Sequence, residues 1–140
     1  MNAHLEREEI LAWLREENTK RLALLWQQAD DTRRAHVGDA VHLRGLVELS
    51  SHCARQCAYC GLRSDNMTLT RYRMTDEEVL AAARQAVGFG YGTVVLQAGE
   101  DYSIRAAWMT EIIRRIKGET ALAVTLSLGE RTPRELEQWR

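Results

Sequence analysis

The chain has 140 residues, of which 45% are hydrophobic and 28% charged, with a formal net charge of -1. This length and composition are typical of one globular domain, and the near-neutral charge gives no support for nucleic-acid binding. No apolar run approaches the roughly 18 residues that would indicate a membrane span, and residues 1–9 lack the apolar centre of a signal peptide. We therefore expect a cytoplasmic protein without a membrane or nucleic-acid partner, in a compartment that keeps thiols reduced.

The first 40 residues are predicted to form two amphipathic helices. One helix presents an apolar stripe made of Ile10, Leu11, Trp13 and Leu14, and the other presents Leu22, Leu25, Trp26 and Ala29. Such stripes are typical of helix packing, which explains both tryptophans, and Asn18 or Thr19 can cap the second helix. We assign residues 1–40 to an N-terminal helical segment.

Strands and helices alternate after Gly38. Strands are predicted over residues 41–49, 93–97 and 122–128. A capping box at 75–78 opens a helix that ends near Phe89 and Gly90, and a second helix runs from about 104 to 117 and stops at Gly118. Thr132 and Pro133 open a third helix near the end of the sequence.

This alternation predicts an α/β fold with a parallel sheet built from right-handed βαβ units. Three units make half of a six- or eight-unit barrel, and a parallel sheet normally has both faces covered. We therefore expect residues 41–140 to form the first half of a (βα) barrel, a partial TIM barrel, within a longer protein. The third strand would then be an open edge that is prone to association.

All three cysteines of the chain, Cys53, Cys57 and Cys60, lie within eight residues and are spaced C-x3-C-x2-C. A cubane iron–sulfur cluster has four cysteine ligands when complete, so three thiolates would leave one iron open to another ligand. A structural zinc site would need His42 or His52 as its fourth ligand. A disulfide framework is disfavoured because three is odd and no secretory signal is present. An open cluster is the leading interpretation.

The third strand alternates between an apolar and a polar face. Leu122, Val124, Leu126 and Leu128 point one way, while Thr125, Ser127 and small residues point the other. The apolar face fits outer helices, and the polar face fits a cavity with Thr125 and Ser127 near a ligand. The first strand places His42, Arg44, Leu46 and Glu48 on one face. Arg44 and Glu48 either pair with each other or line a cavity for an anionic substrate.

Five stretches carry a resemblance to a known family. They are RGLVELS at 44–50, CGLRSDN at 60–66, RYRMT at 71–75, VLQAGE at 95–100 and VTLSLGE at 124–130. Together with the cysteine spacing, they resemble the biotin synthase-like branch of the radical S-adenosylmethionine (SAM) superfamily. Within that branch the chain looks most like the HydE family of [FeFe]-hydrogenase maturases, and the resemblance covers roughly residues 22–140.

The resemblance implies that Cys53, Cys57 and Cys60 bind a [4Fe–4S] cluster whose open iron binds SAM. The implied reaction is the reductive cleavage of SAM to a 5′-deoxyadenosyl radical that is used to mature the hydrogenase active site. No catalytic side chain is assigned beyond the cluster. The implied partners are a small-molecule or small iron-complex substrate, a reductant such as ferredoxin or flavodoxin, and other hydrogenase maturases.

The resemblance also implies SAM contacts. Tyr59 is the aromatic residue of the cysteine motif and is expected near the adenine, with simple loop packing as its alternative. Gln97, Ala98, Gly99 and Glu100 match a G-G-E motif that contacts the SAM amino group, although Ala98 or Gln97 replaces its first glycine. Alternatives to a HydE-type enzyme are a biotin synthase-like enzyme, a methylornithine synthase-like enzyme and a non-catalytic zinc or electron-transfer module.

Overall fold

The structure is a computed structural model that describes residues 5–140. The chain divides into two compact units, Met1–Val41 and His42–Arg140. The first four residues of the predicted segment 1–40 lie outside the described residues. Among the helices of residues 5–140, none has both the length and the apolar character that crossing a bilayer requires.

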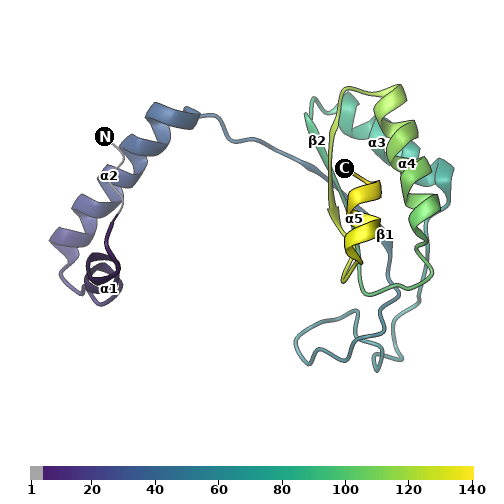
Figure 1. Cartoon of the computed structure of the whole chain (residues 1–140), viewed down its shortest axis with the longest axis horizontal. Coiled ribbons are helices and arrows are strands. Elements are labelled where there is room, and N and C mark those ends of the chain that lie inside the picture. Colours follow the sequence, from purple (N-terminus) through teal and green to yellow (C-terminus); the bar gives the residue numbers. More distant parts are fainter. Residues whose placement is uncertain (1–4) are drawn as a thin grey trace. The chain divides into compact units, whose positions relative to one another are not determined.

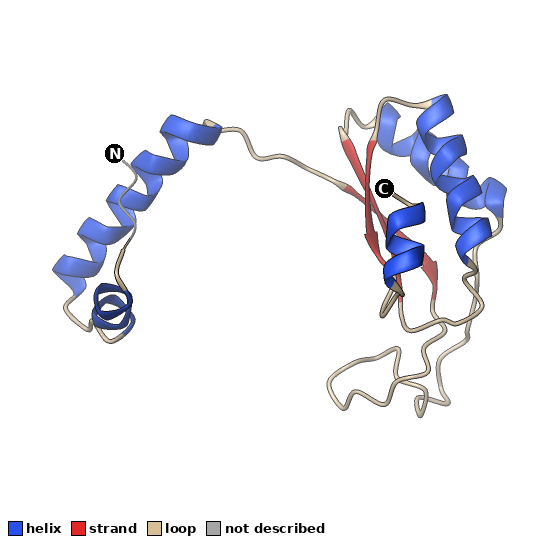
Figure 2. Ribbon diagram, in the orientation of Figure 1, coloured by secondary structure: helices blue, strands red, loops and turns tan. Residues whose placement is uncertain are grey.

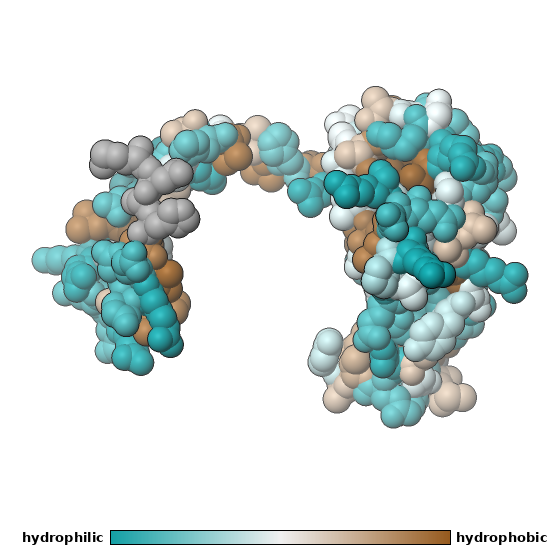
Figure 3. Space-filling view, viewed as in Figure 1, coloured by the Kyte–Doolittle hydropathy of each residue, from teal (hydrophilic) through white to brown (hydrophobic). Residues whose placement is uncertain are grey.

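The first unit contains α1 (Arg7–Leu14) and α2 (Thr19–Val37). Asn18 is the N-cap of α2, as predicted, since its side chain accepts hydrogen bonds from the amides of Lys20 and Arg21 at 3.0 and 3.3 Å. No residue of either helix is buried, and apolar side chains lie at the surface of this unit (Figure 3). The two tryptophans, both predicted to serve helix packing, differ within this unit: Trp13 is half-buried, whereas 63% of Trp26 is exposed.

The second unit is built on a parallel sheet of β1 (Gly45–Ser50), β2 (Thr93–Ala98) and β3 (Ala123–Ser127), in the order β1-β2-β3 (Figure 2). The predicted first strand began at residue 41, four residues too early. The ladder between β1 and β2 begins with Gly45 opposite Val94, so the preceding residues have no strand to pair with. His42 and Arg44 therefore lie before the strand and do not share its face with Glu48.

The helices of this unit are α3 (Asp76–Gly88), α4 (Ala106–Glu119) and α5 (Pro133–Gln138). Capping boxes open α3 at Thr75 and α5 at Thr132, as predicted. The prediction that α4 stops at Gly118 was wrong, because Gly118 lies within the helix. The helix ends at Glu119, and the hydroxyl of its C-cap residue Thr120 donates a hydrogen bond to the Ile116 carbonyl at 2.7 Å.

One face of the sheet packs against α3 and α4, and the core lies between these layers (Figure 1). It is built from apolar side chains that include Leu49, Val79, Leu80, Val94, Leu96, Met109, Ile112, Ile116 and Leu122. Val124 and Leu126 of β3 are half-buried against it, which confirms the apolar face predicted for this strand. The side chains on the opposite face, such as Leu46 and Thr125, are exposed.

Candidate functional site

The candidate site lies where the three parallel strands end, since their carboxyl ends meet at one edge of the sheet. The long cysteine loop follows β1 and extends beyond this edge (Figure 2). The Ala54 amide donates a hydrogen bond to the Glu100 carbonyl at 2.9 Å, so the loops after β1 and β2 touch. The Glu130 amide donates to the Glu100 carboxylate at 3.2 Å, which adds the loop after β3. Three segments that are distant in sequence thus form one site.

The cysteine loop is closed at its base by a short antiparallel pairing. The Ser51 amide donates to the Tyr72 carbonyl at 3.1 Å, and the Tyr72 amide donates to the Ser51 hydroxyl at 2.8 Å. One step further, the Met74 amide donates to the Leu49 carbonyl at 2.8 Å. These bonds return the chain to the end of β1 after the loop that contains the three cysteines.

The three thiols are free and half-buried. Cys53 is held at the base of the loop, where its sulfur accepts hydrogen bonds from the amides of Arg55 and Glu100, both at 3.4 Å. Cys57 and Cys60 lie in one turn, because the Cys60 amide donates to the Cys57 carbonyl at 3.0 Å. Two main-chain donors thus fix the position of the Cys53 sulfur at the base of the loop.

Tyr59 lies on the same turn with 92% of its side chain exposed. The negative charge of the neighbouring Cys57 thiolate, followed by hydrogen bonding to it, raises the pKa of the Tyr59 hydroxyl. The ring is not buried in the loop, so the alternative of loop packing is not what this structure shows. Tyr59 presents its ring outward from the cysteine turn.

Within residues 5–140, no three Cys, His, Asp or Glu side chains converge in a group that could hold a metal ion. The three cysteines therefore share a loop but do not form a metal-binding group in this structure. The donor set still fits an iron–sulfur group with one open iron, because three free thiols lie within eight residues.

Gly99 packs directly against the cysteine loop. A Cβ atom at this position would lie 2.8 Å from the Cys53 Cβ and 2.8 Å from the His52 carbonyl oxygen. Both distances are too short for any side chain, so the turn after β2 can approach Cys53 only with a glycine here. Gly99 is thus placed beside the first cysteine, and its neighbour Glu100 donates its amide to the same sulfur.

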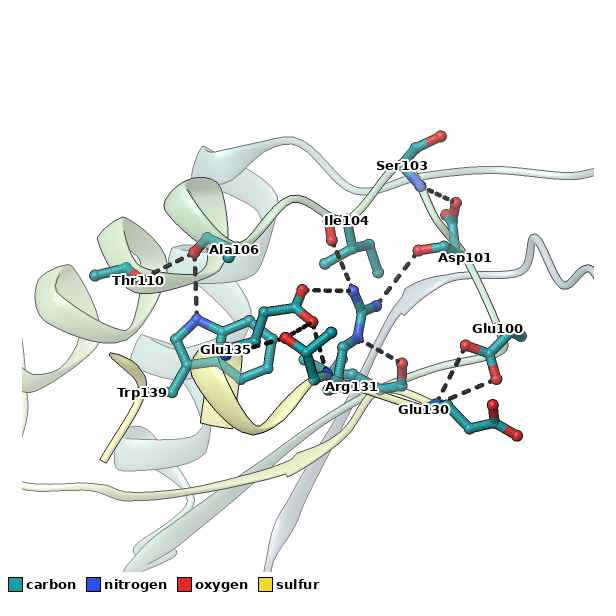
Figure 4. Close-up of polar contacts among 12 residues, drawn as sticks. Glu100, Asp101, Ser103, Ile104, Ala106, Thr110, Glu130, Arg131, Glu135 and Trp139 are labelled. Carbon is teal, nitrogen blue, oxygen red and sulfur yellow. Dashed lines mark hydrogen bonds and ion pairs between the residues drawn. The ribbon is translucent and has the colours of Figure 1, made fainter. Parts of the chain in front are cut away.

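The Glu100 side chain points towards Glu130 in the turn after β3 (Figure 4). Only 7% of Glu100 is exposed, and both of its carboxylate oxygens accept the Glu130 amide at 3.2 Å. Arg55 lies 3.6 Å from the same carboxylate. Gly129, with φ of 76°, gives this carboxylate room, since a Cβ there would lie 2.9 Å from it. The carboxylate is therefore engaged by groups of the chain itself.

Gln97 and Ala98 line a cavity of about 160 Å³ at the end of β1 and β2. Its other walls are Glu48, Ser50, Ser51, Leu62, Leu69 and Tyr72. Gln97 pairs in register with Ser127, so both lie on the uncovered face of the sheet, as does Thr125 two residues earlier. The hydroxyl side chains of β3 and the Gln97 amide thus share a face that continues into this cavity.

Asp101 was not identified from the sequence, although it is the most highly connected carboxylate of the site. It is 3% exposed and accepts the Ser50 hydroxyl at 2.6 Å and two guanidinium bonds from Arg73 at 2.7 and 3.0 Å. Burial raises the pKa of Asp101, but hydrogen bonds from Arg73, Ser50 and the Ser103 amide outweigh it and hold that pKa well below its usual range.

Arg131 was also missed. Its guanidinium donates to the carbonyls of Leu128 at 3.1 Å and Ile104 at 2.9 Å, and it lies 5.9 Å from the centre of the Trp139 ring (Figure 4). The Trp139 ring nitrogen in turn donates to the Ala106 carbonyl at 3.2 Å. These contacts join α5 to the start of α4 and fix the turn that carries Glu130. Of the missed residues, Arg73 lies in the RYRMT stretch, whereas no sequence signal marked Asp101 or Arg131.

Comparison with known proteins gives clear relatives. No protein-family model matches the chain. It is 50% identical over 117 residues to the [FeFe] hydrogenase maturase subunit HydE of Thermotoga maritima, which is 83% of this chain and 33% of that protein. The chain thus spans about a third of the length of this curated relative.

Two solved structures share the fold. The methylornithine synthase PylB superposes with a TM-score of 0.82 at 27% identity, over 96% of this chain and 40% of that one. The hydrogenase maturase HydG superposes with a TM-score of 0.83 at 22% identity, over 94% of this chain and 30% of that one. The second unit is therefore part of a partial TIM barrel, as predicted. The shared sequence and the shared fold place this chain in the radical SAM superfamily, with HydE-like similarity.

Proposed function

We propose that this chain provides the cluster-binding and part of the SAM-binding region of a HydE-type radical SAM enzyme. In this proposal Cys53, Cys57 and Cys60 hold a [4Fe–4S] cluster. The observation that carries it is the contact between the cysteine loop and the turn after β2, where the Glu100 amide donates to the Cys53 sulfur at 3.4 Å. The contact supports the proposal because it joins Cys53, one of the three proposed cluster ligands, to the turn that is proposed to bind SAM.

Cys53, Cys57 and Cys60 would hold the cluster, which would supply the electron for reductive cleavage of SAM to methionine and the 5′-deoxyadenosyl radical. In this proposal the residues of the chain bind and orient the cluster and SAM. The amides of Arg55 and Glu100 orient the Cys53 sulfur. Carbonyl groups of the turn Gln97–Gly99 and the hydroxyls of Thr125 and Ser127 are placed to bind the polar groups of SAM, and the Tyr59 ring can cover its adenine.

The structure changes the proposed role of Glu100. Its carboxylate already accepts the Glu130 amide and faces Arg55. We therefore assign the SAM amino group to main-chain carbonyls of Gln97 and Ala98, and assign the Glu100 side chain to holding the turns after β2 and β3 together.

The 50% identity to HydE supports hydrogenase maturation as the process, with a small molecule or small iron complex as substrate. A ferredoxin or flavodoxin is proposed as the reductant, and other maturases as partners. Methylornithine synthase-like chemistry is the second candidate because of the fold shared with PylB, but its 27% identity is much lower. Product analysis with each candidate substrate separates the two.

The test is anaerobic reconstitution with iron and sulfide, followed by electron paramagnetic resonance (EPR) of the reduced protein with and without SAM. We expect about four irons and four sulfides per chain and a spectrum that shifts when SAM is added, because three thiolates leave one iron open. Cys57→Ser should lose the cluster, while Ser64→Ala in the same loop should keep it. Stoichiometric zinc without labile sulfide would exclude the cluster, and an unchanged spectrum at saturating SAM would indicate an electron-transfer module.

A further inference from the structure

Arg71 has an unusual set of partners for an arginine. Its guanidinium donates hydrogen bonds to four main-chain carbonyls, those of Ser51, Leu62, Arg63 and Asn66. The bonds to Leu62 and Arg63 are both 2.7 Å long. All the hydrogen bonds that this side chain donates within residues 5–140 thus go to the backbone of the cysteine loop.

These carbonyls lie on both limbs of the loop. Ser51 precedes Cys53 in the sequence, whereas residues 62–66 follow Cys60. The Arg71 guanidinium therefore bonds to the backbone on both sides of the segment that carries the three cysteines. Two further bonds tie the second limb to the first. The Ser64 amide donates to the Arg55 carbonyl at 2.8 Å, and the Gln56 side chain donates to Asp65 at 2.9 Å. Together with these two bonds, Arg71 connects the segment before the cysteines to the segment after them.

We infer that Arg71 is a positioning residue that holds the two limbs of the cysteine loop together before the cluster binds. This inference rests on the proposed function for the identity of what the loop holds. Residues 51–71 contain no helix or extended strand, so their order depends on contacts of this kind. Fixing the loop beforehand lowers the conformational entropy lost when the thiolates engage the cluster.

The geometry requires arginine in particular. A guanidinium presents five donors in a rigid plane and can reach carbonyls on two sides, whereas a lysine ammonium offers three donors at one point. Lysine would preserve the positive charge of Arg71 but could join fewer carbonyls. The comparison of Arg71→Lys with Arg71→Gln therefore separates charge from geometry.

The first measurement uses the metal-free chain and chymotrypsin, which cleaves after Tyr59, Leu62 and Leu69 without needing the arginine. We expect Arg71→Gln and Arg71→Lys to be cut in this loop about tenfold faster than the native chain, which corresponds to about 1.4 kcal/mol. Arg114→Lys on the exposed surface of α4 is the matched control and should be cut at the native rate.

The second measurement uses the reconstituted chain and a ferrous-iron chelator under anaerobic conditions. Both Arg71 variants should lose iron about tenfold faster than the native chain, the same factor as in proteolysis. The EPR spectrum of the freshly reduced variants should also broaden, because a loosened loop holds the cluster in several arrangements. The thermal melt of the α/β unit, followed by circular dichroism, should change little in Arg71→Lys.

The outcomes test the proposed function and the positioning role of Arg71 separately. A native chain that takes up no cluster contradicts the proposed function, while the proteolysis comparison still tests Arg71. Native rates of both cleavage and iron loss in Arg71→Lys would overturn the positioning role. The positioning role would also be overturned if the melting temperature of Arg71→Lys fell in proportion to its faster cleavage, because Arg71 would then stabilise the whole unit. If Arg71→Gln does not fold, Arg71→Lys decides alone.

Discussion

Gly99 illustrates how one residue without a side chain can define a site. The turn after β2 reaches the cysteine loop because Gly99 lacks a Cβ atom, which would lie 2.8 Å from the Cys53 Cβ. The approach also brings the Glu100 amide to the Cys53 sulfur. Any side chain at position 99 would push these two loops apart, so the contact that carries the proposed function depends on this glycine.

We predict that Gly99→Ala destabilises the chain by about 1–3 kcal/mol, the usual cost of forcing an extra methyl group into a packed contact. It should also weaken cluster retention, because the Glu100 amide moves away from Cys53. Urea unfolding and iron content measure the two effects. Gly92→Ala is the matched control, since a Cβ at Gly92 meets nothing within 4 Å. Equal unfolding midpoints for the two variants would show that the Gly99 contact is not tight.

Among the elements, α3 shows how local signals set a boundary. Thr75 accepts the Glu78 amide at 3.4 Å, and the Glu78 carboxylate accepts the Thr75 amide at 2.7 Å. The backbone hydrogen bond from Thr75, followed by that from its hydroxyl, lowers the pKa of Glu78. The helix then buries Val79, Leu80, Ala83 and Ala86 against the sheet. The cap therefore fixes where the buried stripe begins.

We predict that Thr75→Ala lowers the free energy of unfolding by about 1 kcal/mol, the typical effect of removing an N-cap side chain. Thr75→Ser keeps the hydroxyl and should stay close to the native value. Urea titration followed by circular dichroism provides the comparison. A loss in Thr75→Ser as large as that in Thr75→Ala would mean that the Thr75 methyl group, rather than its hydroxyl, stabilises the helix start.

At the scale of the whole second unit, Asp101 joins three segments. Ser50 ends β1, Arg73 lies before α3, and Asp101 follows β2, so their hydrogen bonds connect positions 28 and 51 residues apart in sequence. The Asp101 side chain is 2% exposed, whereas that of Arg73 is 44% exposed. The carboxylate is thus the buried centre of this connection, and its ionised form is the one that these donors stabilise.

The lowered pKa of Asp101 determines how stability depends on pH. An unfolded aspartate has a pKa of about 3.9, so this contribution is complete above about pH 5 and is lost as the pH falls towards the lower folded-state pKa. We predict that Asp101→Asn costs about 1.5–3 kcal/mol at pH 7, the usual range for a hydrogen bond to a charged group. Urea unfolding at pH 7 and pH 3 should show a smaller difference at pH 3. A pH-independent Asp101→Asn difference would contradict the electrostatic explanation.

The sequence by itself determined the features that depend on short separations along the chain. The caps at Asn18, Thr75 and Thr132 involve residues at most three positions apart, and hydrophobic alternation marked the buried face of β3. The spacing of the three cysteines, together with the neighbouring sequence stretches, indicated the radical SAM superfamily without any knowledge of tertiary contacts. Short-range hydrogen bonds and side-chain periodicity act within one element, so they can be recognised in the sequence alone.

Only the tertiary structure decided which distant residues meet. β1 begins at Gly45 because that is where β2 offers a partner, and Glu100 faces Glu130 because two turns meet at one edge of the sheet. The bonds of Arg71 and Asp101 likewise cross between segments whose approach depends on how the whole unit packs. Such contacts form only after loop-closure entropy has been overcome by burial of the core, and no local pattern records which partners that packing brings together.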